Sequence, residues 1–327
     1  MNINLENISE IIKIEYGITV SVFTQLNIGF DQNTAVYKIV SMDNKAYFLK
    51  IRTCNFTESS LLIPSLIFDI TGTANIITII KTIHNKLYVK FNSLFIVMYP
   101  FIDGQSGWEA SLTKDQLINF GKFLYSLHSI QASKKYIDII PKEEFNNKYR
   151  KNVKKYLKIH NYVIDGNTGN REFLDIFNRK KDEILNILNC LDQVTREIDY
   201  KNLKMCLCHG DIHAGNILIS GDKFYVVDWD TVVFAPREKD LMFIGGGIGN
   251  KWNKTEEIEN FYNGYGNDIV IDKSLIKYFR LERIIQDIYE FYNQILNKKT
   301  EKGEKELCIR YFLEQFEKNN VVENALL

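Results

Sequence analysis

The sequence of 327 residues predicts an α+β protein with two lobes, a small β-rich lobe followed by a larger helical one. Two patterns lead to this prediction. The first hundred residues alternate apolar and polar side chains as strands do, whereas from Ser111 onward apolar side chains recur at helical spacing. Strands and helices do not alternate regularly along the chain, and this order disfavours a parallel doubly wound sheet. The chain is long enough for each lobe to bury a core.

In the first lobe, β-branched and aromatic residues form short runs that predict a sheet with one inserted helix. Asp43 and Asn44 form a turn signal between two of these runs, which predicts a hairpin. Apolar residues at helical spacing predict the helix. The expected strands are residues 18–23, 34–40, 45–51, 88–91 and 94–99, and the expected helix is 58–68.

The second lobe opens with a helix start, because Thr113 and Gln116 have the spacing of a capping box. Four apolar residues that follow share one helical face, namely Leu117, Phe120, Leu124 and Leu127. Further helices are expected at residues 143–160, 173–194 and 275–296, with short strands at 205–208, 217–219 and 224–227. The charged face of the first of these helices is interpreted as solvated and not as a polyanion site.

The composition excludes some classes of partner. Lys plus Arg and Asp plus Glu number 41 each, so a net charge of zero gives no reason to expect nucleic acid or an anionic membrane as partner. Neither a signal sequence nor a membrane-spanning apolar run is recognisable. The five cysteines are sparse and odd in number, which favours reduced thiols in a cytoplasmic protein.

One loop carries the chemistry. Asp211 follows an apolar strand in the run His209-Gly210-Asp211, Asn216 lies five residues later, and Asp228 ends the strand 224–227. A carboxylate can accept the proton of an attacking hydroxyl, and carboxylate and amide oxygens suit Mg²⁺. The alternative is a polar loop in which Asp211 and Asn216 only cap a turn. That alternative does not explain the second acid at the end of a strand.

These residues resemble the aminoglycoside phosphotransferase family and its choline-kinase relatives, in which His-Gly-Asp is followed by four residues and an Asn. The resemblance implies a bilobal protein-kinase-like fold with ATP and Mg²⁺ as cofactors. It also implies that Asp211 is the base and that Asn216 and Asp228 are magnesium ligands. His209 would orient the loop, and His213 and Asp230 would help or be structural.

The same resemblance assigns residues 1–100 to a nucleotide-binding lobe and 101–327 to a helical lobe with the catalytic loop and the acceptor pocket. Lys50, near the end of a strand, would contact the α/β-phosphates, with Glu58 as its ion-pair partner. Residues 27–34 would cover the nucleotide. The expected inter-lobe hinge, which would hold the adenine, includes Tyr99, Phe101 and Ile102.

The acceptor is expected to be small, because the segment from Asp228 to Pro236 is too short for a protein-kinase activation loop. No protein partner is evident. Residues 208–253 resemble the branch of the family that phosphorylates spectinomycin, which implies transfer of the ATP γ-phosphoryl to a hydroxyl of that antibiotic. Side chains expected to line the pocket, beside Asp211, are Asp230, Asp240, Trp229 and Trp252, since carboxylates and aromatic faces suit cationic amines. Core packing is an equal alternative for both tryptophans.

Other interpretations stay open at this point. A metabolic kinase of the same fold, for choline, thiamine, a sugar or homoserine, would share the chemistry, and a nucleotide-binding pseudokinase would lack turnover. A zinc cluster of Cys206, Cys208, His209 and His213 is disfavoured because the spacing is too tight. The glycines of residues 245–250 do not fit a dinucleotide-binding turn, and we expect them to allow close backbone approach.

Overall fold

The computed structural model describes residues 3–26, 33–53, 57–131, 137–146, 148–158, 168–297 and 300–327. An antiparallel sheet near the N-terminus and a mostly helical remainder confirm the predicted α+β fold. The chain divides into two compact units, which interleave along the sequence. Unit 1 comprises Met1–Gln116, Ser129–Pro141 and Ala214–Val232, and unit 2 comprises Leu117–His128, Lys142–His213 and Val233–Leu327. The lobe boundary near residue 100 therefore stays a prediction.

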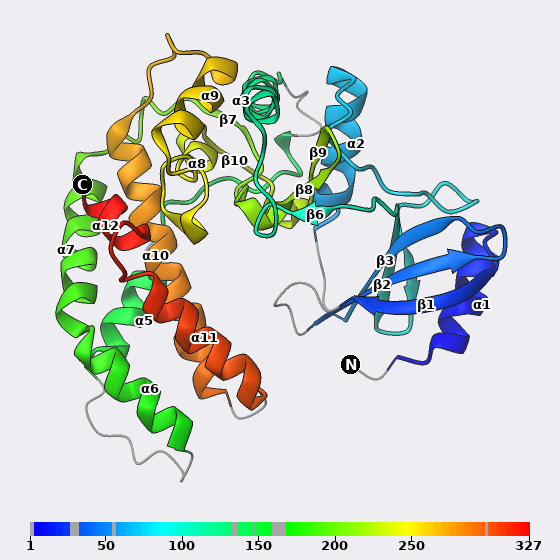
Figure 1. Ribbon diagram of the computed structural model, residues 1–327, viewed down its shortest axis with the longest axis horizontal. Helices are drawn as coiled ribbons and strands as arrows, with labels where there is room; N and C mark the ends of the chain where they lie inside the picture. Colours follow the sequence, from blue (N-terminus) through cyan, green and yellow to red (C-terminus); the bar gives the residue numbers. More distant parts are fainter. Residues whose placement is uncertain are drawn as a thin grey trace. The chain divides into compact units, whose positions relative to one another are not determined.

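Unit 1 is built on a five-stranded antiparallel sheet with the strand order β1-β2-β3-β5-β4 (Figure 1). The strands are β1 (Val20–Leu26), β2 (Thr34–Ser41), β3 (Ala46–Arg52), β4 (Val89–Phe91) and β5 (Leu94–Pro100). The predicted hairpin joins β2 to β3, and Asn44 in its turn has a φ of 61°, a left-handed conformation that Asn tolerates. All five predicted strands are thus confirmed within a few residues.

A helix covers each face of this sheet. On one face, Ile8 and Ile12 of α1 (Leu5–Tyr16) pack with Leu49 and Ile51 of β3. On the other face, Leu61 of α2 (Ser59–Thr71), the predicted helix, packs with Val97 of β5. Successive side chains of a strand point to opposite faces. Since Leu49 and Ile51 face α1, Lys50 and Arg52 face the side of α2.

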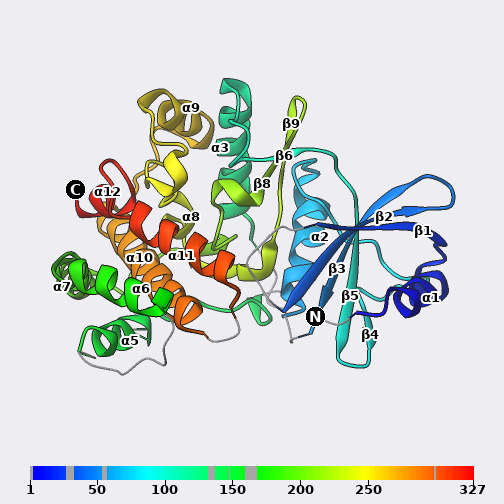
Figure 2. The same ribbon diagram turned by 60° about the horizontal axis from the view of Figure 1, so that its bottom comes forward.

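The rest of unit 1 is a small sheet of β6 (Gln105–Ser106), β8 (Ile217–Ser220) and β9 (Lys223–Val226). One-turn helices flank the β8–β9 hairpin, with η1 (Ala214–Asn216) before it and η2 (Trp229–Thr231) after it. Helix α2 lies beside the hairpin and contacts η2 (Figure 2). The ends of the hairpin are therefore brought to the same face of the five-stranded sheet as Lys50.

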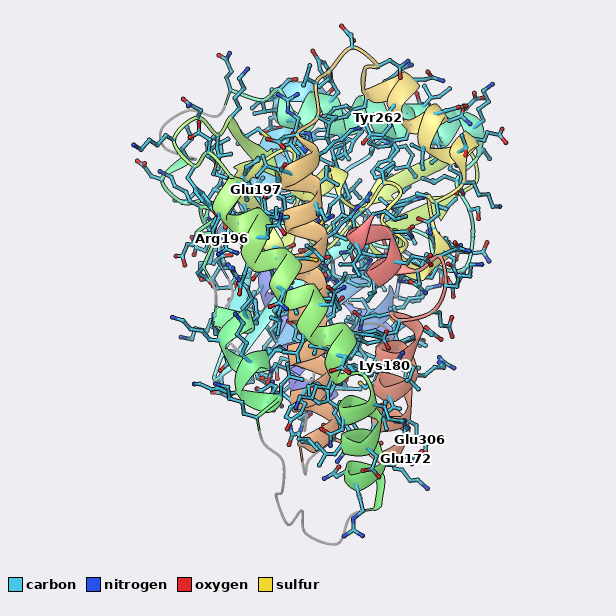
Figure 3. All side chains as sticks on the ribbon, turned by 90° about the vertical axis from the view of Figure 1, so that its left-hand side faces the viewer. Glu172, Lys180, Arg196, Glu197, Tyr262 and Glu306 are labelled. Carbon is cyan, nitrogen blue, oxygen red and sulfur yellow. The ribbon has the colours of Figure 1, made fainter. Side chains whose placement is uncertain are left out.

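Unit 2 is organised around α10 (Lys273–Leu296), whose buried face carries Ile284, Ile285 and Ile288. The predicted helix 275–296 is thereby confirmed. The helices that contact it are α5 (Lys148–Tyr156), α6 (Thr168–Arg179), α7 (Lys181–Glu197), α8 (Glu238–Leu241), α11 (Lys302–Glu314) and α12 (Val321–Leu326). Figure 3 shows α7 running along α10, from Lys180 to Arg196 and Glu197.

The remaining elements of unit 2 support the loop that follows β7. Strand β7 (Met205–Cys208) pairs with β10 (Val233–Pro236), and η3 (Ile248–Asn250) follows α8. Two further helices, α3 (Lys114–His128) and α9 (Thr255–Tyr265), pack closely on each other. The predicted capping box starts α3, because Thr113 N–H donates to Gln116 Oε1 and Gln116 N–H donates to Thr113 Oγ1.

Two helix predictions were wrong in their extent. The single helix expected at 173–194 is split into α6 and α7 at Lys180, whose ψ of 3° is not helical. The Lys180 ammonium bonds Glu183 at 2.8 Å and lies 4.9 Å from the ring centre of Phe316, contacts that favour the break over continued helix. The helix expected at 143–160 covers only α5, because Phe145 has a φ of 50°.

The four cysteines in the described part of the chain, Cys190, Cys206, Cys208 and Cys308, are free. Among the described residues, no helix combines the length and the apolar character that a membrane span requires.

Substitution of Gly264 by Ala tests the close packing of α3 on α9. A Cβ at Gly264 would lie 1.8 Å from the carbonyl oxygen of Ile118, so the two helices must move apart. We expect Gly264→Ala to lower the free energy of unfolding by about 1–3 kcal/mol, measured by chemical denaturation. Gly303→Ala is the control, because a Cβ at Gly303 of α11 meets nothing within 4 Å. Equal stability of the two variants would contradict the packing described.

Candidate active site

In unit 1, two basic residues of β3 meet two acids at the end of the β8–β9 hairpin. The Lys50 ammonium lies 3.2 Å from Asp228 Oδ1 and 3.0 Å from Asp230 Oδ2, and the Arg52 guanidinium donates to the same oxygen of Asp230. The alternation of β3 places both bases on one face, and η2 presents both acids to it. The structure thus brings the predicted residues Lys50, Asp228 and Asp230 together.

The two acids of this cluster differ in their electrostatics. Burial raises the pKa of Asp228, with a smaller contribution from the charge of Asp230, and Lys50 only partly opposes this. Burial also acts on Asp230, but the charges of Lys50 and Arg52 outweigh it and lower the pKa of that carboxyl. Asp230 is therefore paired with the two bases, whereas the charge of Asp228, whose side chain is 48% exposed, is not fully compensated by protein groups.

Asn216 and Asp228 lie close together at the base of the hairpin. Val227 N–H donates to the carbonyl oxygen of Asn216 at 3.0 Å, next to the pairing of Ile217 with Val226. Asp228 has a φ of 61°, a left-handed conformation that a residue with a side chain adopts at a cost and that is typical of functional sites. An amide oxygen and an incompletely neutralised carboxylate are the hard donors that Mg²⁺ prefers, so these residues fit the ion.

Glu58 does not have the predicted partner. Its Oε1 accepts a hydrogen bond from the Tyr88 hydroxyl at 3.2 Å, whereas Lys50 pairs with Asp228 and Asp230. The predicted Lys50–Glu58 ion pair is therefore wrong in this arrangement. Glu58 directly precedes the first turn of α2, and its side chain points toward Tyr88, which directly precedes β4.

The expected hinge residues follow the pairing of β3 with β5. Tyr99 packs edge-on against Phe48 with ring centres 6.1 Å apart, and Phe101 N–H donates to the Ala46 carbonyl oxygen at 3.3 Å. The ring of Phe101 lies beneath the Lys38 ammonium at 4.3 Å, and Ile102 is half-buried. Most of the loop expected to cover the nucleotide, residues 27–32, lies outside the described residues.

In unit 2, a buried carboxylate anchors the loop that carries Asp211. Asp240 is fully buried, and its two oxygens accept the backbone N–H groups of His209 at 2.8 Å and Gly210 at 2.7 Å. The His128 ring bonds Asp240 through Nε2 at 3.1 Å and the Tyr265 hydroxyl through Nδ1 at 2.8 Å. Burial raises the pKa of Asp240, but the hydrogen bond and attraction to His128, together with His209 and the Gly210 N–H, outweigh burial. The pKa is therefore lowered, and the carboxylate is ionised.

This placement corrects one prediction. Asp240 was expected to line the acceptor pocket, but a carboxylate with no exposed surface and this set of donors does not meet a substrate. Its role is to fix the backbone of the loop. His209 contributes as well, because its Nδ1 accepts the backbone N–H of Asp211 at 3.3 Å.

The carboxylate of Asp211 faces a half-buried guanidinium. Arg283 of α10 donates through Nη1 to Asp211 Oδ1 and through Nε to Asp287 Oδ1, the latter at 2.8 Å. Asp211 Oδ2 lies 3.6 Å from His213 Nε2. Burial lowers the pKa of His213 to about 4, so this ring is neutral near pH 7. Asp211 belongs to unit 2, and Asn216 and Asp228 belong to unit 1.

Both tryptophans named from the sequence are core residues. Trp229 is buried, and its Nε1–H donates to the Val226 carbonyl oxygen at 3.2 Å. Trp252 is buried against Phe120, with ring centres 5.2 Å apart. Core packing, the alternative to a place in the acceptor pocket, describes both.

Comparison with known proteins identifies the family. The model of the phosphotransferase enzyme family matches residues 73–273, more than half of the chain. The chain belongs to the phosphotransferase enzyme family. It is accordingly an ATP-dependent small-molecule phosphotransferase with an alcohol group as acceptor, and the predicted aminoglycoside phosphotransferase resemblance is confirmed. No curated protein sequence gave a significant match.

Solved structures agree with this assignment. A spectinomycin phosphotransferase, APH(9)-Ia, in complex with ADP and spectinomycin is 32% identical, with 100% of this chain and 98% of that chain covered and a TM-score of 0.92. Its AMP-bound complex is 33% identical, with 98% of each chain covered and a TM-score of 0.89. An ethanolamine kinase from Plasmodium vivax, 16% identical with 99% and 89% covered and a TM-score of 0.56, shows the fold alone.

Four residues of these clusters were not singled out from the sequence of this phosphotransferase: Arg52, His128, Arg283 and Asp287. Arg52 follows Lys50 by two residues, which on a strand means the same face. Arg283 and Asp287 are four residues apart in a helix whose other stripe is apolar, a spacing typical of an ion pair. His128 ends α3 and carries no local signal, since its partners Asp240 and Tyr265 are more than a hundred residues away.

The disfavoured metal and dinucleotide interpretations gain nothing from the structure. His128, Cys206 and Cys208 have ligand atoms within 4.8 Å of one another, but both His128 nitrogens bond other groups. The two thiols donate to carbonyl oxygens of residues 235 and 236. Gly247, with a φ of 87°, lies so close to the start of α12 that a Cβ would clash, which confirms the expected close backbone approach.

Substitution of Asp240 by Asn tests the anchor of the loop. An amide keeps one acceptor oxygen but turns an NH₂ group toward a backbone N–H, so one buried donor loses its partner. We expect a loss of roughly 2–4 kcal/mol of stability and at least a ~10-fold lower kcat. Thermal unfolding and steady-state kinetics measure both. Asp43→Asn, in an exposed pair with Lys45, is the control. Wild-type kcat in Asp240→Asn would show that the loop does not depend on this carboxylate.

Proposed function

We propose that this phosphotransferase transfers the γ-phosphoryl group of ATP to a hydroxyl of a small aminocyclitol antibiotic, spectinomycin or a close relative, and so confers resistance to it. The observation that carries the proposal is the 32% identity over the whole chain to a spectinomycin phosphotransferase crystallised with ADP and spectinomycin. The two charged clusters support it, because they supply the kinds of groups that this reaction needs.

We assign the cluster of unit 1 to the nucleotide. Lys50 would contact the α/β-phosphates, because it lies on β3 and its positive charge attracts them. Asp228 and Asn216 would hold Mg²⁺, which supplies charge neutralisation for the phosphates when bound. Asp230 and Arg52 keep Lys50 in place, and the hinge residues Tyr99, Phe101 and Ile102 would wall the adenine. Glu58 bonds Tyr88 and fixes the start of α2 instead of contacting Lys50.

We assign the cluster of unit 2 to the acceptor. Asp211 would accept a hydrogen bond from the attacking hydroxyl, orient its oxygen and take its proton. His213, neutral near pH 7, lies beside the same carboxylate and would complete a polar wall. A protein with these acids suits a cationic acceptor, because carboxylates attract protonated amines.

A metabolic kinase of the same fold is the second candidate. The Plasmodium vivax ethanolamine kinase shares this fold, so the fold alone does not choose between the two acceptor classes. A pseudokinase is the third, and the presence of Lys50, Asp211, Asn216 and Asp228 argues against it.

An acceptor screen distinguishes these candidates. ADP release is measured with Mg²⁺ and ATP against spectinomycin, kanamycin, choline, thiamine and homoserine. We expect stimulation by spectinomycin, with a phosphorylated antibiotic found by mass spectrometry. Stimulation only by a metabolite would replace the antibiotic with that metabolite. ATP binding with no stimulation by any acceptor would favour the pseudokinase.

Asp211→Ala should remove most turnover and leave nucleotide affinity nearly unchanged. The carboxylate is needed for the hydroxyl and not for the nucleotide, so we expect kcat to fall about 10²–10⁴-fold. Steady-state kinetics and isothermal titration with ADP measure the two effects. A near wild-type kcat would refute the assignment of the base.

Asp228→Ala should weaken nucleotide binding in the presence of Mg²⁺ and leave metal-free binding much less affected. Titration of ADP with and without Mg²⁺ measures the difference. Asp222→Ala, at the exposed tip of the same hairpin, is the control. A Mg²⁺ dependence equal to that of the wild type would exclude Asp228 as a ligand.

A further inference from the structure

One arginine ties the catalytic loop to the central helix of unit 2. Arg283 of α10 lies between two carboxylates, with Nη1 on Asp211 Oδ1 and Nε 2.8 Å from Asp287 Oδ1. The guanidinium carbon of Arg283 lies over the ring of Phe243, 5.8 Å from the ring centre. Two acids and one ring thus define the position of a single charged group.

The support for Arg283 is rigid. Asp287 follows it by one helical turn, so the Arg283–Asp287 pair is set by the geometry of α10. Helix α10 has 24 residues and contacts the six helices named above, and Ile284, between the pair, is buried. Arg283 is 21% exposed and Asp287 is 24% exposed, whereas the Arg310–Glu314 pair of α11 is 63% and 43% exposed. An orientation fixed in this way passes to the carboxylate of Asp211.

The charges around Asp211 come from two elements. Arg283 and Asp287 face it from α10, and His213 and His209 face it from its own loop. Burial raises the pKa of Asp211, but the charge and hydrogen bond of Arg283, together with His213 and His209, outweigh burial and hold that pKa below its usual range. On Asp287 the balance is the reverse, and burial raises the pKa to about 6 in spite of Arg283.

This asymmetry has a chemical consequence. A carboxylate whose pKa is lowered is a weak base, so it takes little of the hydroxyl proton before phosphoryl transfer begins. Phosphoryl transfer has a loose transition state that depends mainly on positioning and electrostatics, and it does not need a strong base. A fixed, ionised carboxylate is therefore the more useful group at this place.

We propose that Arg283, fixed by Asp287, is a positioning residue for phosphoryl transfer, which supplies the counter-charge of the Asp211 carboxylate and holds it in one orientation for the acceptor hydroxyl. The proposal rests on the proposed function, since it takes Asp211 as the group that meets the acceptor. It adds a specific electrostatic dependence of that group on α10.

The experiment compares Arg283→Met, Arg283→Lys and Asp287→Asn with Arg310→Met, a control from the exposed pair on α11. The pH dependence of kcat/KM for the acceptor is measured for each at saturating ATP. In Arg283→Met the largest contribution that opposes burial at Asp211 is lost, so the pH at which activity is lost on acidification moves toward neutrality. We expect kcat at pH 7 to fall ~10-fold or more while KM for ATP is kept. Arg283→Lys should recover part of the loss, Asp287→Asn should show a smaller shift, and Arg310→Met should match the wild type.

A second readout does not need turnover. The ¹³C signal of the Asp211 carboxyl, assigned with Asp211→Asn, is titrated in folded wild type and Arg283→Met without ligands. A higher pKa in the variant supports the proposal, and an unchanged pKa and pH profile overturn it. If the wild type phosphorylates no acceptor, the proposed function fails, and the carboxyl titration still decides whether Arg283 controls Asp211. If Arg283→Met does not fold, the same comparison is made with Arg283→Lys, which keeps the charge and loses the planar set of donors. A wild-type carboxyl titration with a lower kcat would support the positioning role, and an unchanged kcat would overturn it.

Discussion

The buried carboxylate of Asp240 is the constraint on which the catalytic loop depends. Its two oxygens accept the backbone N–H groups of His209 and Gly210, and Nε2 of His128, from α3, bonds it as well. A charge without exposed surface is tolerated only when donors surround it, so the loop, α8 and α3 hold one another in register. Because Gly210 has a φ of 86°, the chain can turn at the anchored residues, and the side chain of Asp211 points toward Arg283.

In both units, charged side chains share a group of opposite charge. Asp230 is held by Lys50 and Arg52, and Arg283 is held between Asp211 and Asp287. In each cluster one acid is fully compensated by arginine or lysine and has a lowered pKa, while its neighbour keeps a raised one. Neighbouring acids with pKa values driven apart are typical of sites that assign different tasks to similar groups. The pattern suits the different tasks that we propose for the two clusters.

Sequence reasoning was successful where the determining interactions are local. Strand alternation located all five strands of the sheet, and Asp43-Asn44 located the hairpin. The roles that the sequence indicates for Asp211, Asn216 and Asp228 stay predictions. It was unsuccessful where long-range contacts decide. Lys180, where the expected helix is interrupted, lies over the ring of Phe316. Glu58 bonds Tyr88 and not Lys50. Asp240 accepts hydrogen bonds from backbone N–H groups about thirty residues away. Arg283 could not be predicted for the same reason, because an arginine on an amphipathic helix has no local feature that shows that it bonds Asp211.

The most direct test of this account is a crystal structure of the protein with Mg²⁺, a non-hydrolysable ATP analogue and spectinomycin. The account predicts one antibiotic hydroxyl within hydrogen-bonding distance of the Asp211 carboxylate, with Asp240 still bonded to His209 and Gly210 and Arg283 still bonded to Asp211. Spectinomycin bound with no hydroxyl near Asp211, or a loop detached from Asp240 in the complex, would contradict it.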